Sequence, residues 1–244
     1  MAEKLHQIDL GGPEDPQAAT AKAKEITKRY LTRFDHVKKG KDAYANGKWT
    51  IAIKSYREYL KIMTETKNVS IKQFSPKNFD HKIELAEMLV ISHIFWDLTI
   101  LYDRSPGLEQ EFESCLNLYL SFTIGFKYHN ANLASFRRYI SIKDVRNKTD
   151  FNKAYNTLLS SSKKCFIATL CFGSDDVITN DYRVFKKWLL KYRLGLKFVD
   201  NYYHYSPKLI ALIEHRPVYR FVFVEGIAKP FLRIGHYLRT FGRK

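Results

Sequence analysis

The chain has 244 residues, 45% of them hydrophobic, which is enough to bury one large core or two small ones. Its 41 lysines and arginines outnumber its 25 acidic residues, and the formal net charge of +16 attracts anionic partners. Three cysteines form no dense framework, and no histidine spacing resembles a metal-binding motif. The composition excludes a disulfide-stapled secreted domain and predicts a cytoplasmic protein that needs neither metal nor cofactor.

Residues 1–16 are expected to form a flexible arm, because glycines and prolines stand there in a polar setting. Asp15 followed by Pro16 is a helix-start signal, since aspartate caps free N–H groups and proline fits the first helical position. Apolar residues then recur at spacings of three to four, which is typical of an amphipathic helix. A helical region is therefore expected from residue 17.

A helical hairpin is indicated by the small residues Gly40 and Ala52, which flank a turn at Gly47. The segment resembles a tetratricopeptide repeat, and the resemblance implies that Gly40 and Ala52 lie where two helices cross closely. The departures from the usual repeat are His36, Lys39 and Thr64. Because one repeat cannot bury its own faces, the hairpin is expected to pack on further helices within a TPR-like bundle over 17–160.

Those further helices are predicted from their apolar periodicity, and their expected ranges are 80–103, 108–127, 131–142 and 151–159. The most apolar run, Leu85 to Tyr102, is interrupted by charged residues and is expected to be a buried helix rather than a membrane span. The serines and lysines of 160–164 predict a linker after the bundle.

The text after this linker reads Cys-Phe-Ile-Ala-Thr-Leu-Cys-Phe-Gly-Ser at 165–174, Phe-Lys-Lys-Trp-Leu at 185–189, Gly-Leu-Lys-Phe at 195–198 and Tyr-Tyr-His-Tyr-Ser-Pro at 202–207. Over about 165–224 it resembles the CFI-box C-terminal domain, a short bacterial module. The chain departs from that family at Leu170, Cys171, Phe172 and Leu196, the last of which replaces an arginine. The resemblance implies a helical module over 165–244 but no activity.

Within this module we expect helices at 182–192, 196–203 and 206–215, the last beginning at Ser206-Pro207. Pro217 and Gly226 are expected to break the chain after them. A final amphipathic helix is predicted from Pro230, with the apolar stripe Phe231, Ile234, Leu238 and Phe241. The predicted fold class is therefore all-α, with TPR-like hairpins packed beside a helical CFI-box-like module.

This architecture predicts a non-catalytic protein-protein interaction adaptor or a structural component of a bacterial assembly, because TPR-like grooves bind peptides. The expected partner-binding residues are Lys41, Tyr44, Lys48, Arg137 and Arg138. The basic last helix predicts attachment to an anionic surface through Lys229, Arg233, Arg239, Arg243 and Lys244.

Two alternatives come from other classes of protein. A thiol-dependent enzyme would use Cys165 as nucleophile with His204 near it, provided that a cation lowers the pKa of the thiol. A peripheral membrane or nucleic-acid binder would use the basic last helix. Structural packing is the favoured interpretation of Cys165, because free cysteine is among the most buried residue types.

Overall fold

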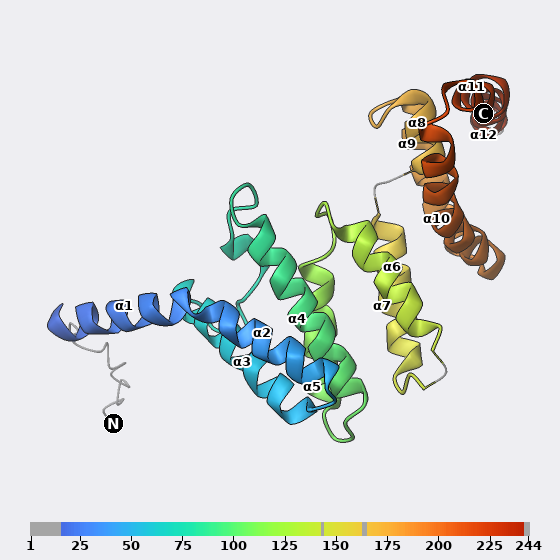
Figure 1. The fold of residues 1–244 in the computed structure, drawn as a ribbon. Coiled ribbons are helices and arrows are strands. Elements are labelled where there is room, and N and C mark those ends of the chain that lie inside the picture. Colours follow the sequence, from blue (N-terminus) through green and yellow to red (C-terminus); the bar gives the residue numbers. More distant parts are fainter. Residues whose placement is uncertain (1–15, 143, 163–164, 242–244) are drawn as a thin grey trace, which may run out of the picture. The chain divides into compact units, whose positions relative to one another are not determined.

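The computed structural model describes residues 16–142, 144–162 and 165–241, and every regular element in this part of the chain is a helix (Figure 1). The all-α prediction is therefore confirmed. The elements are α1 (Pro16–Leu31), α2 (Arg33–Ala45), α3 (Trp49–Thr66), η1 (Pro76–Asn78), α4 (Leu85–Asp103), α5 (Glu109–Ser121), α6 (His129–Ile140), α7 (Lys148–Ser161), α8 (Phe166–Phe172), α9 (Val177–Leu189), α10 (Arg193–Glu214), α11 (Pro217–Phe221), η2 (Val222–Ala228) and α12 (Lys229–Phe241).

Contacts divide the chain between Phe122 and Thr123 into two compact units, which are described separately below. We call them the N-terminal unit and the C-terminal unit. This division differs from the expected boundary at 160–165, because α6 and α7 belong with the C-terminal helices. The expected arm ends one residue early, since Pro16 is the first residue of α1, and the rest of that arm lies outside the described residues.

In the N-terminal unit, α2 and α3 form a hairpin whose turn contains Gly47 at a φ of +69°. Gly40 is buried at the crossing of the two helices. A Cβ atom added there would lie 2.5 Å from Cε1 of Tyr56, and Ala52 is fully buried on α3. The small residue at position 40 is therefore required by the Tyr56 ring, whose hydroxyl donates a 2.7 Å hydrogen bond to Asp97 on α4.

Replacing Gly40 with alanine is expected to destabilise this unit by roughly 1–3 kcal/mol, because the added methyl group overpacks the seam against the Tyr56 ring. Gly226→Ala is the matched control, since nothing lies within 4 Å of a Cβ atom at that helical glycine. Urea unfolding of both variants checks the expectation. A Gly40→Ala midpoint equal to that of the control would show that the ring moves aside freely.

The core of the N-terminal unit lies between α3, α4 and α5. Phe74, Phe79, Phe95 and Phe122 form an aromatic cluster in which Phe74 and Phe79 meet edge to face at 5.5 Å. By length and composition α4 could cross a membrane, but 56% of its most apolar stretch is buried inside the protein. Its Glu87 also forms an ion pair with Arg33, so α4 is the central helix of this unit.

In the C-terminal unit, α6 and α7 pack through Phe136 and Phe151, whose rings meet edge to face at 5.7 Å. Asp200 on α10 joins this pair to the rest of the unit. It accepts a 2.8 Å hydrogen bond from Arg137 on α6 and a second bond from the Tyr155 hydroxyl on α7. The helices α6 and α7 precede the segment that resembles the CFI-box domain, and they therefore pack as part of the same unit.

The second and third helices predicted for the module are one helix, α10, which contains Pro207. The prediction of a break was wrong because Ser206 is buried in the packed face of α10 instead of capping a new helix. Pro207 itself is exposed on that helix. The packed residues of α10 before and after Pro207 stabilise the helix by more than the loss of one backbone hydrogen bond destabilises it.

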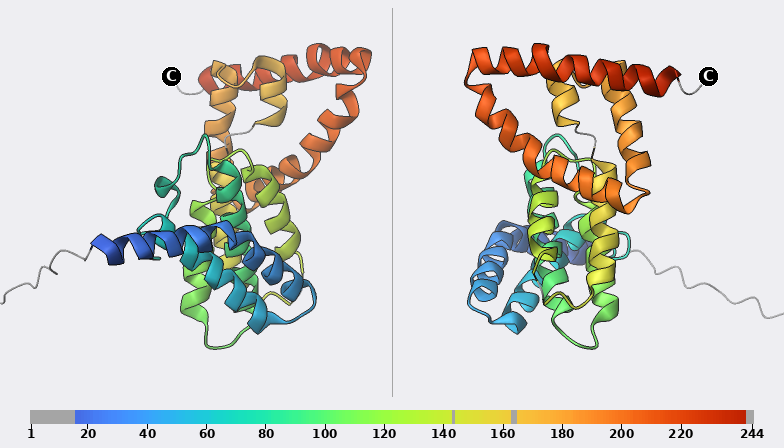
Figure 2. Two further views of the ribbon diagram at one scale, coloured as in Figure 1. Left: turned by 60° about the vertical axis from the view of Figure 1, so that its left-hand side comes forward. Right: turned by 90° about the vertical axis from the view of Figure 1, so that its right-hand side faces the viewer.

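Gly226 does not break the chain either, because α11, η2 and α12 form one continuous helix (Figure 2). η2 is a π-helical segment, whose hydrogen bonds span one residue more than those of an α-helix. Pro230 lies two residues after its end and would otherwise collide with the carbonyl group four residues earlier, at Gly226. The wider turn accommodates the proline, so the helix continues to Phe241.

Candidate functional site

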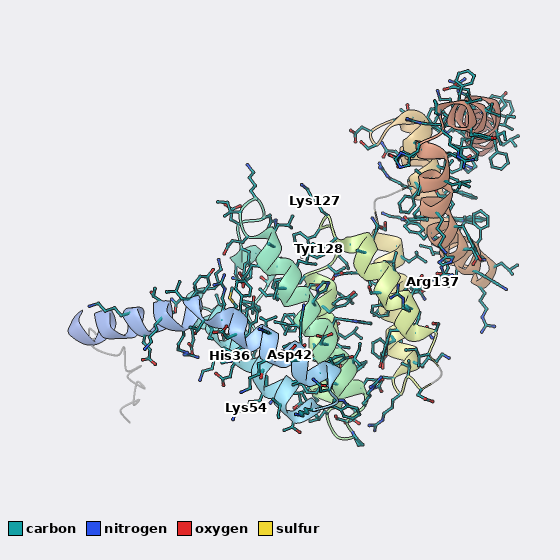
Figure 3. All side chains as sticks on the ribbon, viewed as in Figure 1. His36, Asp42, Lys54, Lys127, Tyr128 and Arg137 are labelled. Atoms are coloured by element: carbon teal, nitrogen blue, oxygen red, sulfur yellow. The ribbon has the colours of Figure 1, made fainter. Side chains whose placement is uncertain are left out.

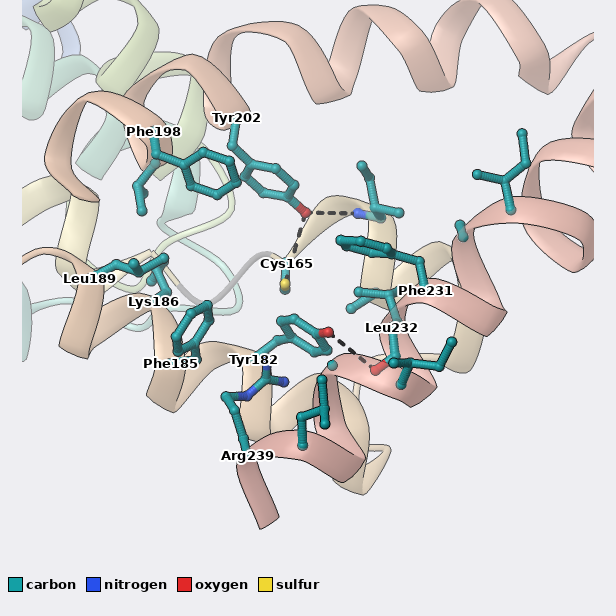
Figure 4. A pocket seen from close by; sticks show the side chains of 18 of the residues that line it. Cys165, Tyr182, Phe185, Lys186, Leu189, Phe198, Tyr202, Phe231, Leu232 and Arg239 are labelled. Carbon is teal, nitrogen blue, oxygen red and sulfur yellow. Dashed lines mark hydrogen bonds between the residues drawn. The ribbon is translucent and has the colours of Figure 1, made fainter. Parts of the chain in front are cut away.

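The C-terminal unit contains an open cavity of about 570 Å³ between α8, α9, α10, η2 and α12 (Figure 4). The buried apolar part of its lining comes from Ala168, Val199, Ala228 and Leu232. The remaining lining includes large apolar side chains that stay more than half exposed, and these are Phe198, Ile227, Phe231, Ile234 and Leu238. A cavity of this size and apolar character suits a small ligand or a partner side chain.

Residues of the segment that resembles the CFI-box domain form the inner wall of this cavity. Cys165 directly precedes α8, and Gly173 follows the helix with a φ of +91°. The Asp176 side chain caps α9 by accepting a 2.8 Å bond from the Ile178 amide. The Tyr202 hydroxyl accepts a 2.9 Å bond from the Ile167 amide and so ties α10 to the start of α8. These residues therefore have packing roles.

Gly195 allows the first turn of α10 to approach the end of α9. A Cβ atom at this position would collide with the carbonyl oxygen of Leu189. Any other residue would have to push α9 and α10 apart, and this explains the glycine in the CFI-like text. The two helices consequently hold Phe185 and Phe198 on the same cavity.

Most polar side chains that line the cavity already hold partners. The Tyr182 hydroxyl donates a 3.1 Å bond to the Leu232 carbonyl, and Lys186 Nζ donates to the Ser162 carbonyl and, at 3.2 Å, to the Tyr203 hydroxyl. Burial lowers the pKa of the Lys186 amine to about 8. Lysine side chains are mostly exposed in folded proteins, but Lys186 is only 9% exposed.

Cys165 also lines the cavity, with Sγ 3.8 Å from the Tyr202 hydroxyl. Burial raises the pKa of this thiol, and the bond to Tyr202 offsets the rise only in part. His204 instead contacts Lys208, at 2.9 Å, and no hydrogen bond within the described chain joins it to Cys165. The expected pair is therefore not assembled, and the neutral thiol that burial favours is a poor nucleophile.

α12 is held on α9 by a charged cluster around Asp181. This carboxylate lies 2.7 Å from Arg239 Nη2 and 3.0 Å from His236 Nδ1. The guanidinium of Arg239 also lies over the Tyr182 ring, 4.0 Å from its centroid. Arg239 was predicted to bind an anionic surface, but the structure places it inside the unit, 19% exposed, with Asp181 as its partner.

The side of α12 opposite this cluster is apolar and exposed. We call it the outer face, and its residues are Phe231, Ile234, Tyr237, Leu238 and Phe241, each at least 60% exposed. Lys229 and Arg233 flank it. Lys229 pairs with Glu225 at 2.5 Å, and the Arg233 guanidinium lies 5.8 Å from the Phe172 ring centroid. The predicted Arg243 and Lys244 lie outside the described residues.

The positive charge of the chain is concentrated in the C-terminal unit. Residues 123–244 contain 23 of the 41 lysines and arginines but only 8 of the 25 acidic residues. Nearly all of the net charge of +16 therefore belongs to the unit that carries the outer face. Its electrostatic field attracts anionic surfaces and ligands to that unit.

The five predicted partner-binding residues are divided between the two units. Lys41 and Lys48 are exposed in the N-terminal unit, where Tyr44 is half-buried and burial raises the pKa of its hydroxyl. In the C-terminal unit Arg138 is exposed, whereas Arg137 on α6 (Figure 3) pairs with Asp200. The five residues therefore belong to two different units, three to the first and two to the second.

Sequence reasoning missed the contribution of Asp181 and Tyr182, which hold α12, and the burial of Lys186. Asp181 and Arg239 are 58 residues apart in the chain, and their pairing leaves no local pattern. For Lys186 the sequence gives only a partial signal. It lies three residues after Arg183 and directly before another lysine, on a helix with a strongly apolar side. This pattern shows that the helix has a buried side, but it does not show which of the lysines faces that side.

Comparison of the chain with models of known protein families, with curated proteins and with solved structures finds no match. The resemblances to the tetratricopeptide repeat and to the CFI-box domain therefore stay predictions.

Proposed function

We propose that the chain is a non-catalytic adaptor that attaches to an anionic membrane surface through its C-terminal unit and offers its N-terminal unit to protein partners. The observation that carries the proposal is the outer face of α12, an exposed apolar stripe with basic residues beside it in a unit that holds nearly all of the net positive charge. Such a stripe is larger than the isolated apolar side chains that monomeric proteins normally expose.

A membrane surface suits this face better than nucleic acid. Helices that lie in the membrane interface bury an apolar side in the headgroup region and hold lysine and arginine at its edges. Lys229 and Arg233 lie at such an edge, whereas aromatic and aliphatic side chains occupy the centre of the face. Phosphate recognition would require the cations at the centre.

A thiol-dependent enzyme has less support. The environment of Cys165 raises its pKa, and His204 contacts Lys208 instead of the thiol. In this proposal Cys165 therefore has a structural role, because it immediately precedes α8 and lines the cavity.

The double variant Tyr237→Asp with Phe241→Asp is expected to weaken binding to vesicles of phosphatidylcholine and phosphatidylserine by at least roughly tenfold. Two exposed apolar side chains, at 60% and 68%, become charged and no longer enter the interface. Vesicle sedimentation of the full chain measures the loss. Binding of the parent should be weaker to pure phosphatidylcholine and should fall with added salt.

The matched control replaces two comparably exposed apolar residues of the N-terminal unit, Ile51→Asp with Ile71→Asp, at 44% and 49% exposure. This variant should sediment with vesicles as the parent does. The proposed membrane attachment is wrong if the parent stays in the supernatant with both vesicle types, or if the two double variants bind equally.

A further inference from the structure

The cavity of the C-terminal unit shares Phe231, Ile234 and Leu238 with the outer face of α12 but differs from it in having cationic residues in its lining. Among the described residues that line it none is acidic, and two are cationic, Lys186 and Arg239. Its rim side chains are unusually exposed for their size, at 62% for Phe198 and 73% for Phe231. These side chains gain free energy when an apolar occupant covers them.

The walls favour an occupant that is mostly hydrocarbon. The hydroxyls of Tyr182 and Tyr202 and the amine of Lys186 are already hydrogen-bonded within the unit. A peptide with polar groups directed at these walls would lose hydrogen bonds to water and gain few in return. A hydrocarbon chain loses none, and the remaining surface of the cavity is aliphatic and aromatic.

The charges of the lining define the other end of the occupant. Arg239 is already paired with Asp181. Lys186 is hydrogen-bonded to the Ser162 carbonyl and the Tyr203 hydroxyl and has no carboxylate partner among the described residues, so its charge attracts an anionic head and repels a cationic one. The surrounding unit adds a positive field of its own. An occupant with a hydrocarbon chain and a single carboxylate combines both properties.

We propose that this cavity binds a free long-chain fatty acid, with its chain along the apolar walls and its carboxylate toward Lys186. The site shares Phe231, Ile234 and Leu238 with the proposed membrane contact, whereas Tyr237 and Phe241 of the outer face are not part of the cavity lining. Substitutions at Tyr237 and Phe241 therefore test the membrane contact separately from the cavity.

The test uses the full chain without vesicles and a naturally fluorescent polyunsaturated fatty acid, cis-parinaric acid, below its micelle concentration. The parent is expected to saturate at one site per chain, and palmitate should displace the probe. Ala228→Phe fills the cavity from its buried side and should weaken binding at least roughly tenfold. Leu212→Phe on α10, at an exposed position outside the cavity, should bind as the parent does.

A second measurement keeps the test decisive if Ala228→Phe fails to fold. Cys165 lines the cavity, so its alkylation by a small maleimide should slow by about tenfold when palmitate is present at ten times its dissociation constant. The buried Cys115 of the N-terminal unit is the internal reference and should not respond. Probe binding without protection of Cys165 would place the ligand elsewhere and overturn the proposal.

Three further comparisons separate the possible outcomes. A long-chain alcohol should bind more weakly than the acid, and equal binding would overturn the role of the carboxylate. Absence of fatty-acid binding in a chain that still sediments with vesicles would overturn this inference alone. The Tyr237→Asp with Phe241→Asp variant should bind the fatty acid as the parent does, even when it no longer binds vesicles. If this variant lost both vesicle binding and fatty-acid binding, the proposal of a separate fatty-acid site would be overturned.

Discussion

Glu87→Ala is expected to lower the free energy of unfolding of the N-terminal unit by about 3–5 kcal/mol. Glu87 accepts hydrogen bonds from Arg33 at 3.1 and 2.9 Å and from the Tyr59 hydroxyl, and the Arg33 and Glu87 side chains are only 13% and 9% exposed. Removing the carboxylate leaves the guanidinium charge in a largely dry site. Urea unfolding followed by tryptophan fluorescence, with Trp188→Phe as background, reports on this unit alone.

Two further variants distinguish a buried charge pair from ordinary loss of contacts. Glu65→Ala breaks the more exposed pair of Arg29 and Glu65, at 30% exposure for each side chain, and should cost less than about 1 kcal/mol. Arg33→Met combined with Glu87→Met removes both charges and should recover most of the lost stability. Equal losses for Glu65→Ala and Glu87→Ala would contradict this account of the core.

Asp181→Ala is expected to release α12 from α9 and to increase hydrogen exchange of the α12 amides by roughly 30-fold to 1,000-fold. The change removes both hydrogen bonds from Arg239 and the bond with His236. The Arg239 charge would then lie over the Tyr182 ring without an anion. Glu225→Ala is the control, because it breaks only the Lys229 pair on the surface of the same helix.

The same cluster predicts an acid limit for the docking of α12. Burial acts to raise the pKa of Asp181, but hydrogen bonds from His236 and Arg239 outweigh it and hold that pKa below its ordinary value of 3.8. The carboxylate therefore stabilises docking fully above that value, and the stabilisation is lost as the pH falls below it. Below that pH, the hydrogen-exchange rates of the α12 amides in the parent should approach those in the Asp181→Ala variant. A difference between the two that persists unchanged through this range would contradict the role of Asp181.

Much of the helical pattern was predictable because it is local. The spacing of Phe231, Ile234, Leu238 and Phe241 was sufficient to predict α12. Asp15 and Pro16 indicated the start of α1, and the small residues beside Gly47 indicated the α2–α3 hairpin. Each of these signals depends on residues within a few turns of one another, so no knowledge of distant contacts is needed.

The candidate site was far less predictable, because its residues meet only through packing. Lys186 has lysine neighbours in the sequence, yet it alone among them is buried, beneath Ser162 and Tyr203. Asp181 and Arg239 acquire their roles from a contact across 58 residues. The cavity likewise requires five helical segments to converge, and no one of them indicates it.

The sequence by itself determined that the chain is helical, that its charge is strongly positive and that its last helix has one apolar side, because periodicity and composition are properties of short segments. Only the tertiary structure decided that Pro207 and Gly226 stay inside helices, and that Arg239 is an internal partner while Phe241 is exposed. The physical reason is that a backbone break or a buried charge costs a few kcal/mol, which packing and pairing with distant residues can offset.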